Sequence, residues 1–300
     1  MKPLSSNFTK VKKVLWIILF ANIAVAALKV IVGTVISSTS MIADGFHSFT
    51  DGSSNIVGLI GVHFASKPVD EDHPYGHGKF EMLAGLFIAG MLLMLSGKIV
   101  MDAVSRIFNP VLPDITLESL LVLLLTLVIN IFVSTFEFKA GKKLNSQILI
   151  SDSMHTRSDI FITIGVLATL ISIKLGLPPI VDPLASFIVA GFIIHTAYEI
   201  FTANSSILLD KVAVDANIIR DIVLSFEQVK DAHKIRSRGS KNDLHIDMHI
   251  MLEPGLSVEE SHELIHLIED RIKDEIKQKV QLIAHIEPYN ADTALWQTKE

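Results

Sequence analysis

Hydrophobic residues in the first two thirds of the chain occur in long runs, whereas in the last third they alternate with polar residues over short intervals. A helix needs roughly 20 apolar residues to span the hydrocarbon of a bilayer. Six stretches meet this length and predict six transmembrane helices. They are residues 14–35, 41–64, 82–107, 116–136, 148–174 and 183–208.

The first apolar run also has the three parts of a cleavable signal peptide: a basic segment, a short apolar core and the small-residue sequence Ala24-Val25-Ala26. The run continues to Val35, however, and its removal would change the parity of the remaining loops. We therefore favour a first transmembrane helix over a signal peptide.

The alternation after residue 208 predicts a small soluble domain. Residues 214–226 are amphipathic with a helical period, residues 232–238 and 244–252 alternate as strands, and residues 280–287 form a last strand. Ser257 begins a second helix, with Glu260 at the spacing of a capping box. The predicted fold class is a membrane α-helical bundle of six transmembrane helices, residues 1–208, followed by a small α+β domain, residues 209–300.

Composition and charge agree with this division. Hydrophobic residues make up 50% of the chain, and its mean hydropathy is +0.47. The first 208 residues have 14 basic and 14 acidic side chains, so the whole net charge of −6 lies in residues 209–300. An acidic soluble domain argues against binding to nucleic acid phosphates. With no cysteine in the chain, any metal must be bound by histidines and carboxylates.

Basic residues predict the orientation of the spans. By the positive-inside rule, loops rich in lysine face the cytoplasm. The lysines of the N-terminus and of the loops after spans 2 and 4 lie on one side of the membrane, and with six spans both termini lie on that side. We expect a multi-pass protein of the cell membrane with cytoplasmic termini. The lysines are Lys2, Lys10, Lys12, Lys13, Lys67, Lys79, Lys139, Lys142 and Lys143.

Ionisable residues inside two of the spans are the strongest functional signal, because they are costly in lipid. Spans 2 and 5 share the pattern D-x2-H-x3-D at an offset of 108 residues, although the two helices cross the bilayer in opposite directions. The residues are Asp44, His47 and Asp51 in span 2 and Asp152, His155 and Asp159 in span 5.

Depth along the two helices predicts a shared site, since Asp51 and Asp159 both fall near the midplane. One histidine and one aspartate from each helix give two nitrogen and two oxygen ligands, a set that suits Zn2+ and accepts Co2+, Cd2+ or Fe2+. The alternative is that these groups only hydrogen bond between helices. For Asp44 and Asp152 two roles stay open: a structural role, or a relay on the route of the ion. Because metal binding requires neutral imidazole, exchange of metal against protons is a natural hypothesis.

Two further clusters have metal-ligand types. Asp70, His73 and His77 lie in the loop between spans 2 and 3, where the alternative is a solvated acidic turn. In the soluble domain, His245, Asp247 and His249 alternate along one face of a strand, His285 and Glu287 alternate along another, and His262 and His266 share a helix face. These groups predict either a binuclear metal site or solvated surface histidines.

The chain resembles the cation diffusion facilitator family along nearly its whole length. The marks are H-x3-D from His47, H-x3-D from His155, and the loop P-x-D-E-D-H-P-Y-G-H-G-K from Pro68. The resemblance implies a homodimeric efflux transporter of divalent metals with six spans. It also implies a metallochaperone-like, ferredoxin-like αββαβ cytoplasmic domain that dimerises when metal binds.

The resemblance also implies roles for individual residues. A pair between Lys79 and Asp210 would lock the dimer near the membrane. His47 at the first transport position favours zinc and disfavours manganese. The implied metal ligands are His47, Asp51, His155 and Asp159 at the transport site, Asp70, His73 and His77 at a loop site, and His249, His262, His285 and Glu287 in the cytoplasmic domain.

We therefore expect a metal–proton antiporter that exports zinc from the cytoplasm, with Fe2+, Co2+, Cd2+ or Mn2+ as the alternative main substrate. A membrane metal sensor is a second alternative. We do not expect an enzyme, because the family that the chain resembles consists of transporters. The expected partners are a second copy of the chain, divalent metal ions, protons and the lipid bilayer, with no cofactor and no nucleic acid.

Overall fold

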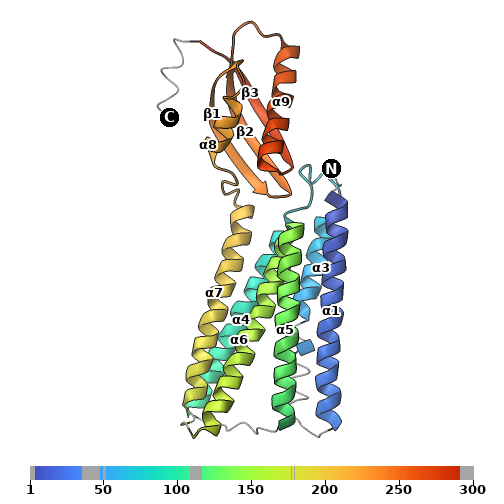
Figure 1. Cartoon of the computed structure of the whole chain (residues 1–300), viewed down its shortest axis with the longest axis vertical. Coiled ribbons are helices and arrows are strands. Elements are labelled where there is room, and N and C mark those ends of the chain that lie inside the picture. Colours follow the sequence, from blue (N-terminus) through green and yellow to red (C-terminus); the bar gives the residue numbers. More distant parts are fainter. Residues whose placement is uncertain are drawn as a thin grey trace. The chain divides into compact units, whose positions relative to one another are not determined.

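The computed structural model describes residues 4–35, 48–49, 52–108, 117–176, 178 and 180–290. The chain divides into two compact units, Met1–Ser205 and Ser206–Glu300. The helices of the first unit run along one another (Figure 1). They are α1 (Leu4–Val35), α3 (Ser53–Ala65), α4 (Phe80–Phe108), α5 (Leu117–Leu144), α6 (Gln147–Lys174) and α7 (Val181–Leu208).

Several of these helices can cross a membrane. Among the described residues, four segments are long and apolar enough: Asn7–Val32, Phe80–Phe108, Leu120–Leu144 and Val181–Leu208. Helix α3 is a shorter apolar helix, and α6 has 28 residues, with Asp152, His155, Arg157 and Asp159 in its first half and Lys174 at its end. A multi-span membrane unit is thereby confirmed. Of the second predicted span, residues 41–47 and 50–51 lie outside the described residues, and with them Asp44, His47 and Asp51.

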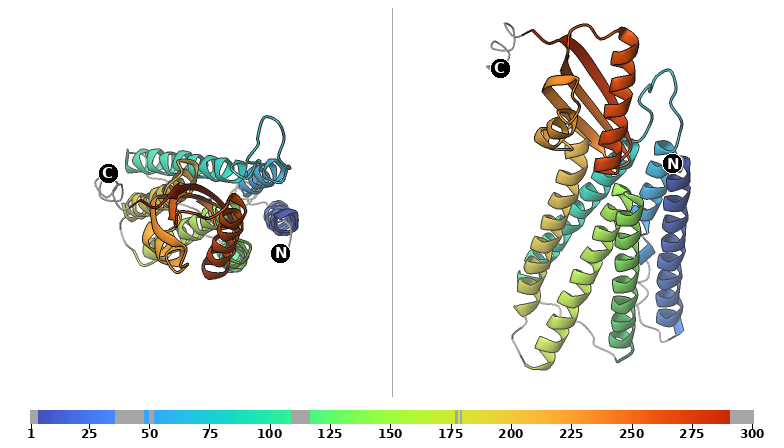
Figure 2. Two further views of the ribbon diagram at one scale, coloured as in Figure 1. Left: turned by 90° about the horizontal axis from the view of Figure 1, so that it is seen from above. Right: turned by 45° about the horizontal axis from the view of Figure 1, so that its top comes forward.

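Small residues let the helices of the membrane unit approach closely, as is typical in lipid. Gly61 of α3 packs against α4 so tightly that a Cβ there would lie 2.4 Å from the Cβ of Ala84. Helices α5 and α6 have the most extensive contact of any helix pair in the described chain, and they lie side by side in Figures 1 and 2. Large side chains such as Phe132 and Met94 point outward.

The second unit has the predicted order of one helix, two strands, one helix and one strand, which confirms the αββαβ domain. Its elements are α8 (Ala216–Val223), β1 (Val229–Ser240), β2 (Asp243–Leu252), α9 (Val258–Ile276) and β3 (Val280–Pro288). The central strand β2 pairs antiparallel with β1 and parallel with β3. Ser257 and Glu260 form the predicted capping box at the start of α9.

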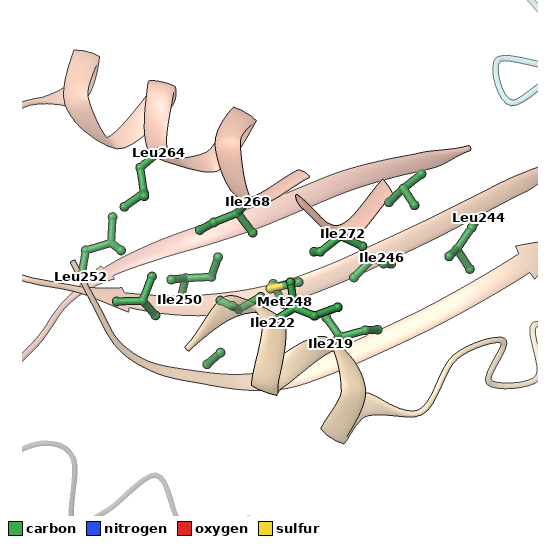
Figure 3. Close-up of a cluster of buried hydrophobic side chains, with 14 residues drawn as sticks. Ile219, Ile222, Leu244, Ile246, Met248, Ile250, Leu252, Leu264, Ile268 and Ile272 are labelled. Carbon is green, nitrogen blue, oxygen red and sulfur yellow. The ribbon is translucent and has the colours of Figure 1, made fainter. Parts of the chain in front are cut away.

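Both helices of this unit cover the same face of the sheet. Ile246, Met248 and Ile250 of β2 point toward α8 and α9 and are fully or almost fully buried (Figure 3). The helices contribute Ile219 and Ile268, among others, to the same core. Since side chains alternate along a strand, the odd-numbered residues of β2 lie on the opposite face. That face presents the histidines.

Candidate metal centres

Helix α6 positions the described half of the predicted transport site. Asp152, His155 and Asp159 are spaced three and four residues apart, so they share one side of the helix. His155 is 4% exposed, whereas Asp159 is partly buried. Thr163 donates to the backbone carbonyl of Asp159 at 2.8 Å. His47 and Asp51 lie outside the described residues, so convergence of the four ligands stays a prediction.

His155 and Asp159 line a cavity of about 90 Å3 inside the bundle. The cavity wall also includes polar groups from other helices, among them Asn22 of α1 and Asn130 of α5. Imidazole nitrogen and carboxylate oxygen are ligands for Zn2+, and amide and hydroxyl oxygens can add to them for harder ions. The cavity therefore has the chemistry of a divalent cation site.

Lys29 of α1 lines the same cavity, and sequence analysis missed it. The side chain is 5% exposed, and its ammonium donates to the hydroxyl of Ser48 at 2.9 Å. A buried ammonium inside a membrane span is as costly as a carboxylate. A lone lysine in an apolar run was the available signal, but it lacked the repeated pattern that drew attention to His155.

A chain of buried side chains leads from α1 to α6 and on to α5. Asn22 donates to Asn55 at 2.8 Å, and Asn55 donates to a carboxylate oxygen of Asp152. Asp152 in turn faces Glu137 of α5, and both carboxyl groups are 0% exposed. Sequence analysis identified Asp152 and missed Glu137, which lies one residue past the end of the predicted fourth span.

The loop between α3 and α4 brings its three predicted ligands together. One oxygen of Asp70 lies 3.0 Å from Nδ1 of His73, and the other lies 3.3 Å from Nε2 of His77. One potential ligand atom from each residue lies within 4.8 Å of the others. Nδ1 of His77 lies 3.0 Å from the carbonyl of Pro68, which orients the ring so that Nε2 faces Asp70.

Electrostatics favour an ionised carboxylate in this loop. Desolvation raises the pKa of Asp70, but the hydrogen bonds from His73 and the charges of His77 and His73 together lower it below its ordinary value. Asp70 and His73 are exposed, whereas His77 is 5% exposed. The loop can therefore present one carboxylate and two imidazoles to an ion arriving from solvent.

The open face of the sheet in the second unit aligns three histidines in one row. His233 of β1 pairs with His249 of β2, which pairs with His285 of β3. Glu287 of β3 lies 2.8 Å from Nδ1 of His249 and 3.6 Å from Nε2 of His233. One potential ligand atom from each of His233, His249 and Glu287 lies within 4.8 Å of the others. His285 adjoins them, with Nε2 3.8 Å from Glu287.

This row presents a charged oxygen ligand among imidazoles. The hydrogen bond from His249 holds the pKa of Glu287 below its ordinary value against an opposing effect of desolvation, and the charges of His233, His249 and His285 add to the lowering. The sequence identified His249, His285 and Glu287 as ligands, whereas it gave His233 no ligand role.

Two residues of the second unit with predicted roles, His262 and Asp210, make contacts other than the predicted ones. His262 of α9 lies beside His266, with 3.2 Å between their Nε2 atoms, and in the described residues it is not in the cluster of His249 and Glu287. Its ligand role stays a prediction. Asp210 lies 3.6 Å from Arg238 of its own unit, and its pairing with Lys79 also stays a prediction.

Comparisons with known proteins identify the family of the chain. The family model for the cation efflux transmembrane domain matches residues 15–209, and the model for the cytoplasmic domain of cation efflux proteins matches residues 213–289. An uncharacterized transporter of Methanocaldococcus jannaschii is 33% identical over 88% of this chain and 94% of its own. Manganese efflux system protein MneP of Bacillus subtilis is 30% identical over 93% and 96%. Metal tolerance protein 2 of Oryza sativa subsp. japonica is 30% identical over 89% and 76%.

A multi-span helical unit followed by a small α+β unit is the arrangement that these two family models describe, and it belongs to membrane transporters of metal ions. The chain belongs to the cation diffusion facilitator family, whose members are transporters and not enzymes. Its activity is efflux of divalent metal cations, and its cytoplasmic unit belongs to the dimerising domains of that family.

Proposed function

We propose that this protein exports zinc from the cytoplasm in exchange for protons, through a site formed by His47, Asp51, His155 and Asp159. The observation that supports the site most directly is the burial of His155 next to Asp159 at a polar cavity of the membrane unit. A buried imidazole at this position supplies a nitrogen ligand, which zinc accepts more readily than manganese does.

Proton exchange follows from the ligand chemistry. An imidazole binds metal only in its neutral form, so arrival of the metal expels any proton from His155 and His47. In an alternating-access cycle the metal then leaves outward, and protons that enter from outside occupy the empty ligands. A proton gradient directed inward would in this way drive the metal outward.

Orientation and regulation complete the proposal. By the positive-inside rule, the termini, the loop of Asp70 and the cytoplasmic unit face the cytoplasm of a cell whose plasma membrane holds the protein. There the cluster of His233, His249 and Glu287 binds metal at rising concentration and shifts the dimer toward its active state. His262 and His285 would complete this site in the dimer.

Manganese is the second candidate substrate, because the relative MneP is named as a manganese efflux protein. Oxygen ligands suit manganese, and the cavity around Asp159 has amide and hydroxyl oxygens from Asn22, Asn130 and Thr163. Zinc and manganese exporters would share the fold and the route and would differ in the preference of the site.

The deciding experiment measures uptake of Zn2+ and Mn2+ into inverted proteoliposomes, with and without a proton gradient. We expect gradient-dependent zinc uptake that His155→Ala abolishes and that His195→Ala retains, since His195 is 70% exposed on α7. His155→Asp should shift the preference toward Mn2+, because it replaces nitrogen by oxygen.

Other outcomes would correct the proposal in defined ways. Faster uptake of Mn2+ than of Zn2+ by the wild type would establish the manganese exporter. Zinc uptake that ignores the gradient would rule out proton exchange. In the same assay, the double variant His249→Ala/His285→Ala should need more zinc for activation and still transport; equal activation would contradict the regulatory role.

A further inference from the structure

Two acidic side chains of neighbouring helices face each other inside the membrane unit, apart from the predicted transport ligands. Glu137 of α5 and Asp152 of α6 are both 0% exposed. Neither oxygen of Glu137 has a hydrogen-bond donor in the described chain, and Oδ1 of Asp152 has none either. The other oxygen of Asp152 accepts from the amide of Asn55.

Among the described residues, neighbouring elements bring no positive charge into hydrogen-bond contact with these two groups. Helix α3 contributes the neutral amide of Asn55, which is held by Asn22 of α1. Of the charged groups that the structure describes, Asp152 is the one that interacts electrostatically with the carboxyl group of Glu137.

Two ionised carboxylates cannot face each other at low dielectric without a counter-charge, because desolvation and repulsion both disfavour the charged forms. A proton resolves this conflict. One carboxyl then donates a hydrogen bond to the other, as in pairs of acidic side chains that share one proton. The amide of Asn55 fixes Asp152 as the acceptor side of such a pair.

We propose that Glu137 and Asp152 form a proton-binding pair that holds one proton in the resting protein and serves as a station for proton movement through the membrane unit. Asp152 lies three residues before His155 in the first turns of α6. Glu137 lies two turns from the end of α5 at the hairpin that joins the two helices. The pair thus lies between the hairpin and the transport cavity.

Its place in export rests on the proposed function. Protons that have entered in exchange for metal must leave at the cytoplasmic side, where the α5–α6 hairpin lies by the positive-inside rule. Buried acidic residues are the usual relays for such movement in transporters. The proton joins one carboxylate oxygen of the pair and later departs to water, so the pair returns to its starting state.

The first test detects the proton itself. Infrared spectra of the full chain in detergent should contain the carbonyl band of a buried protonated carboxyl group at neutral pH. We expect this band in the wild type and in Glu199→Gln, and a loss of its intensity in Glu137→Gln and Asp152→Asn. Glu199 of α7 is the control because its side chain is 54% exposed.

The second test separates proton coupling from metal passage. In proteoliposomes, Glu137→Gln should lose zinc uptake driven by the proton gradient and retain exchange of zinc for zinc at equal pH. His155→Ala should lose both, which distinguishes failure of this pair from failure of the proposed transport site. A wild type without the infrared band would overturn the proposal. So would gradient-driven uptake that survives in Glu137→Gln, or exchange that is lost together with it.

Discussion

The two units of this protein bury different kinds of side chain. In the cytoplasmic unit, isoleucine, leucine, methionine and valine fill a closed core between two helices and a sheet, and few polar groups are buried. In the membrane unit, the buried set includes Asn55, Glu81, Glu137, Asp152 and Asn204, whereas large apolar side chains such as Phe132 face outward. The membrane unit also buries apolar residues such as Leu92 and Ile193, so burial separates apolar from polar side chains in the cytoplasmic unit but not in the membrane unit.

The difference follows from the solvent. Water drives aliphatic side chains into a core, and each buried methylene group adds to stability. Lipid gives no such drive, so helices associate through close packing of small residues and through hydrogen bonds between helices. Substitutions of the same chemical size should accordingly have different effects in the two units.

The largest effect should come from the aliphatic core of the cytoplasmic unit. Ile268→Ala leaves a cavity between α9 and the sheet, and we expect a loss of about 2–5 kcal/mol in the free energy of unfolding of this unit. Ile268 is 0% exposed and Leu267, its neighbour in α9, is 60% exposed. Leu267→Ala should therefore change stability by no more than about 0.5 kcal/mol.

Native-state hydrogen exchange of the β2 amides in the full chain would measure both values. Amides of β2 exchange through unfolding of the unit if the core holds them, so their opening free energy should fall in Ile268→Ala. Similar protection in the two variants would mean that the core in Figure 3 does not dominate the stability of this unit.

In the membrane unit, the addition of one methyl group should be harmful between packed helices and harmless at an exposed position. Gly61→Ala places a Cβ 2.4 Å from that of Ala84, so α3 and α4 must separate. We expect a destabilisation of about 1–3 kcal/mol. Gly90→Ala is the matched control, because no atom lies within 4 Å of its added Cβ, and alanine favours a helix over glycine.

Thermal unfolding in detergent, followed by size exclusion, would rank the two glycine variants. We expect a lower midpoint temperature for Gly61→Ala than for the wild type, and an equal or higher one for Gly90→Ala. Equal midpoints for the two variants would show that α3 and α4 can separate at little cost, contrary to the close packing of the membrane unit.

The same contrast explains which features the sequence could predict. The αββαβ order and the capping box are local, because strand alternation, helical period and cap spacing lie within a few residues of one another. Alternation placed His249 and Glu287 on one face of their own strands, and the family resemblance assigned them as ligands. His233 was missed because β1 shifts register between His233 and Arg236, and this irregularity places it opposite His249 without any sign in the pattern.

In the membrane unit the hydrophobic pattern locates the helices. It does not determine how each helix is rotated about its axis, because apolar residues lie on all sides of it. His155 and Asp159 were found through the repeated motif. Glu137 and Lys29 have no repeated counterpart, and their partners lie on other helices. Asp152, the partner of Glu137, is 15 residues away in the sequence, and Ser48, the partner of Lys29, is 19 residues away. Contacts of this kind depend on helix rotation, which only the packed structure supplies.

The smallest expected effect concerns the start of α9, where polar contacts in water hold a helix end. The hydroxyl of Ser257 accepts from the backbone N–H of Glu260 at 3.2 Å, so Ser257→Ala should destabilise the first turn by about 1 kcal/mol. Ser257→Thr keeps a hydroxyl and should restore most of the loss. Hydrogen exchange of the first-turn amides would measure the effect locally, and equal protection in the alanine and threonine variants would contradict it.

Acid should weaken the same helix end in the wild type. The hydrogen bonds from the backbone and then the hydroxyl of Ser257 lower the pKa of Glu260. A group with a lowered pKa in the folded state stabilises that state above its ordinary pKa, and this contribution is lost as the pH falls through the lowered value. Ser257→Ala retains the backbone contact and should lose part of the acid sensitivity, whereas Glu260→Gln should lose all of it. First-turn protection that falls equally with pH in Glu260→Gln and in the wild type would assign the sensitivity to another group.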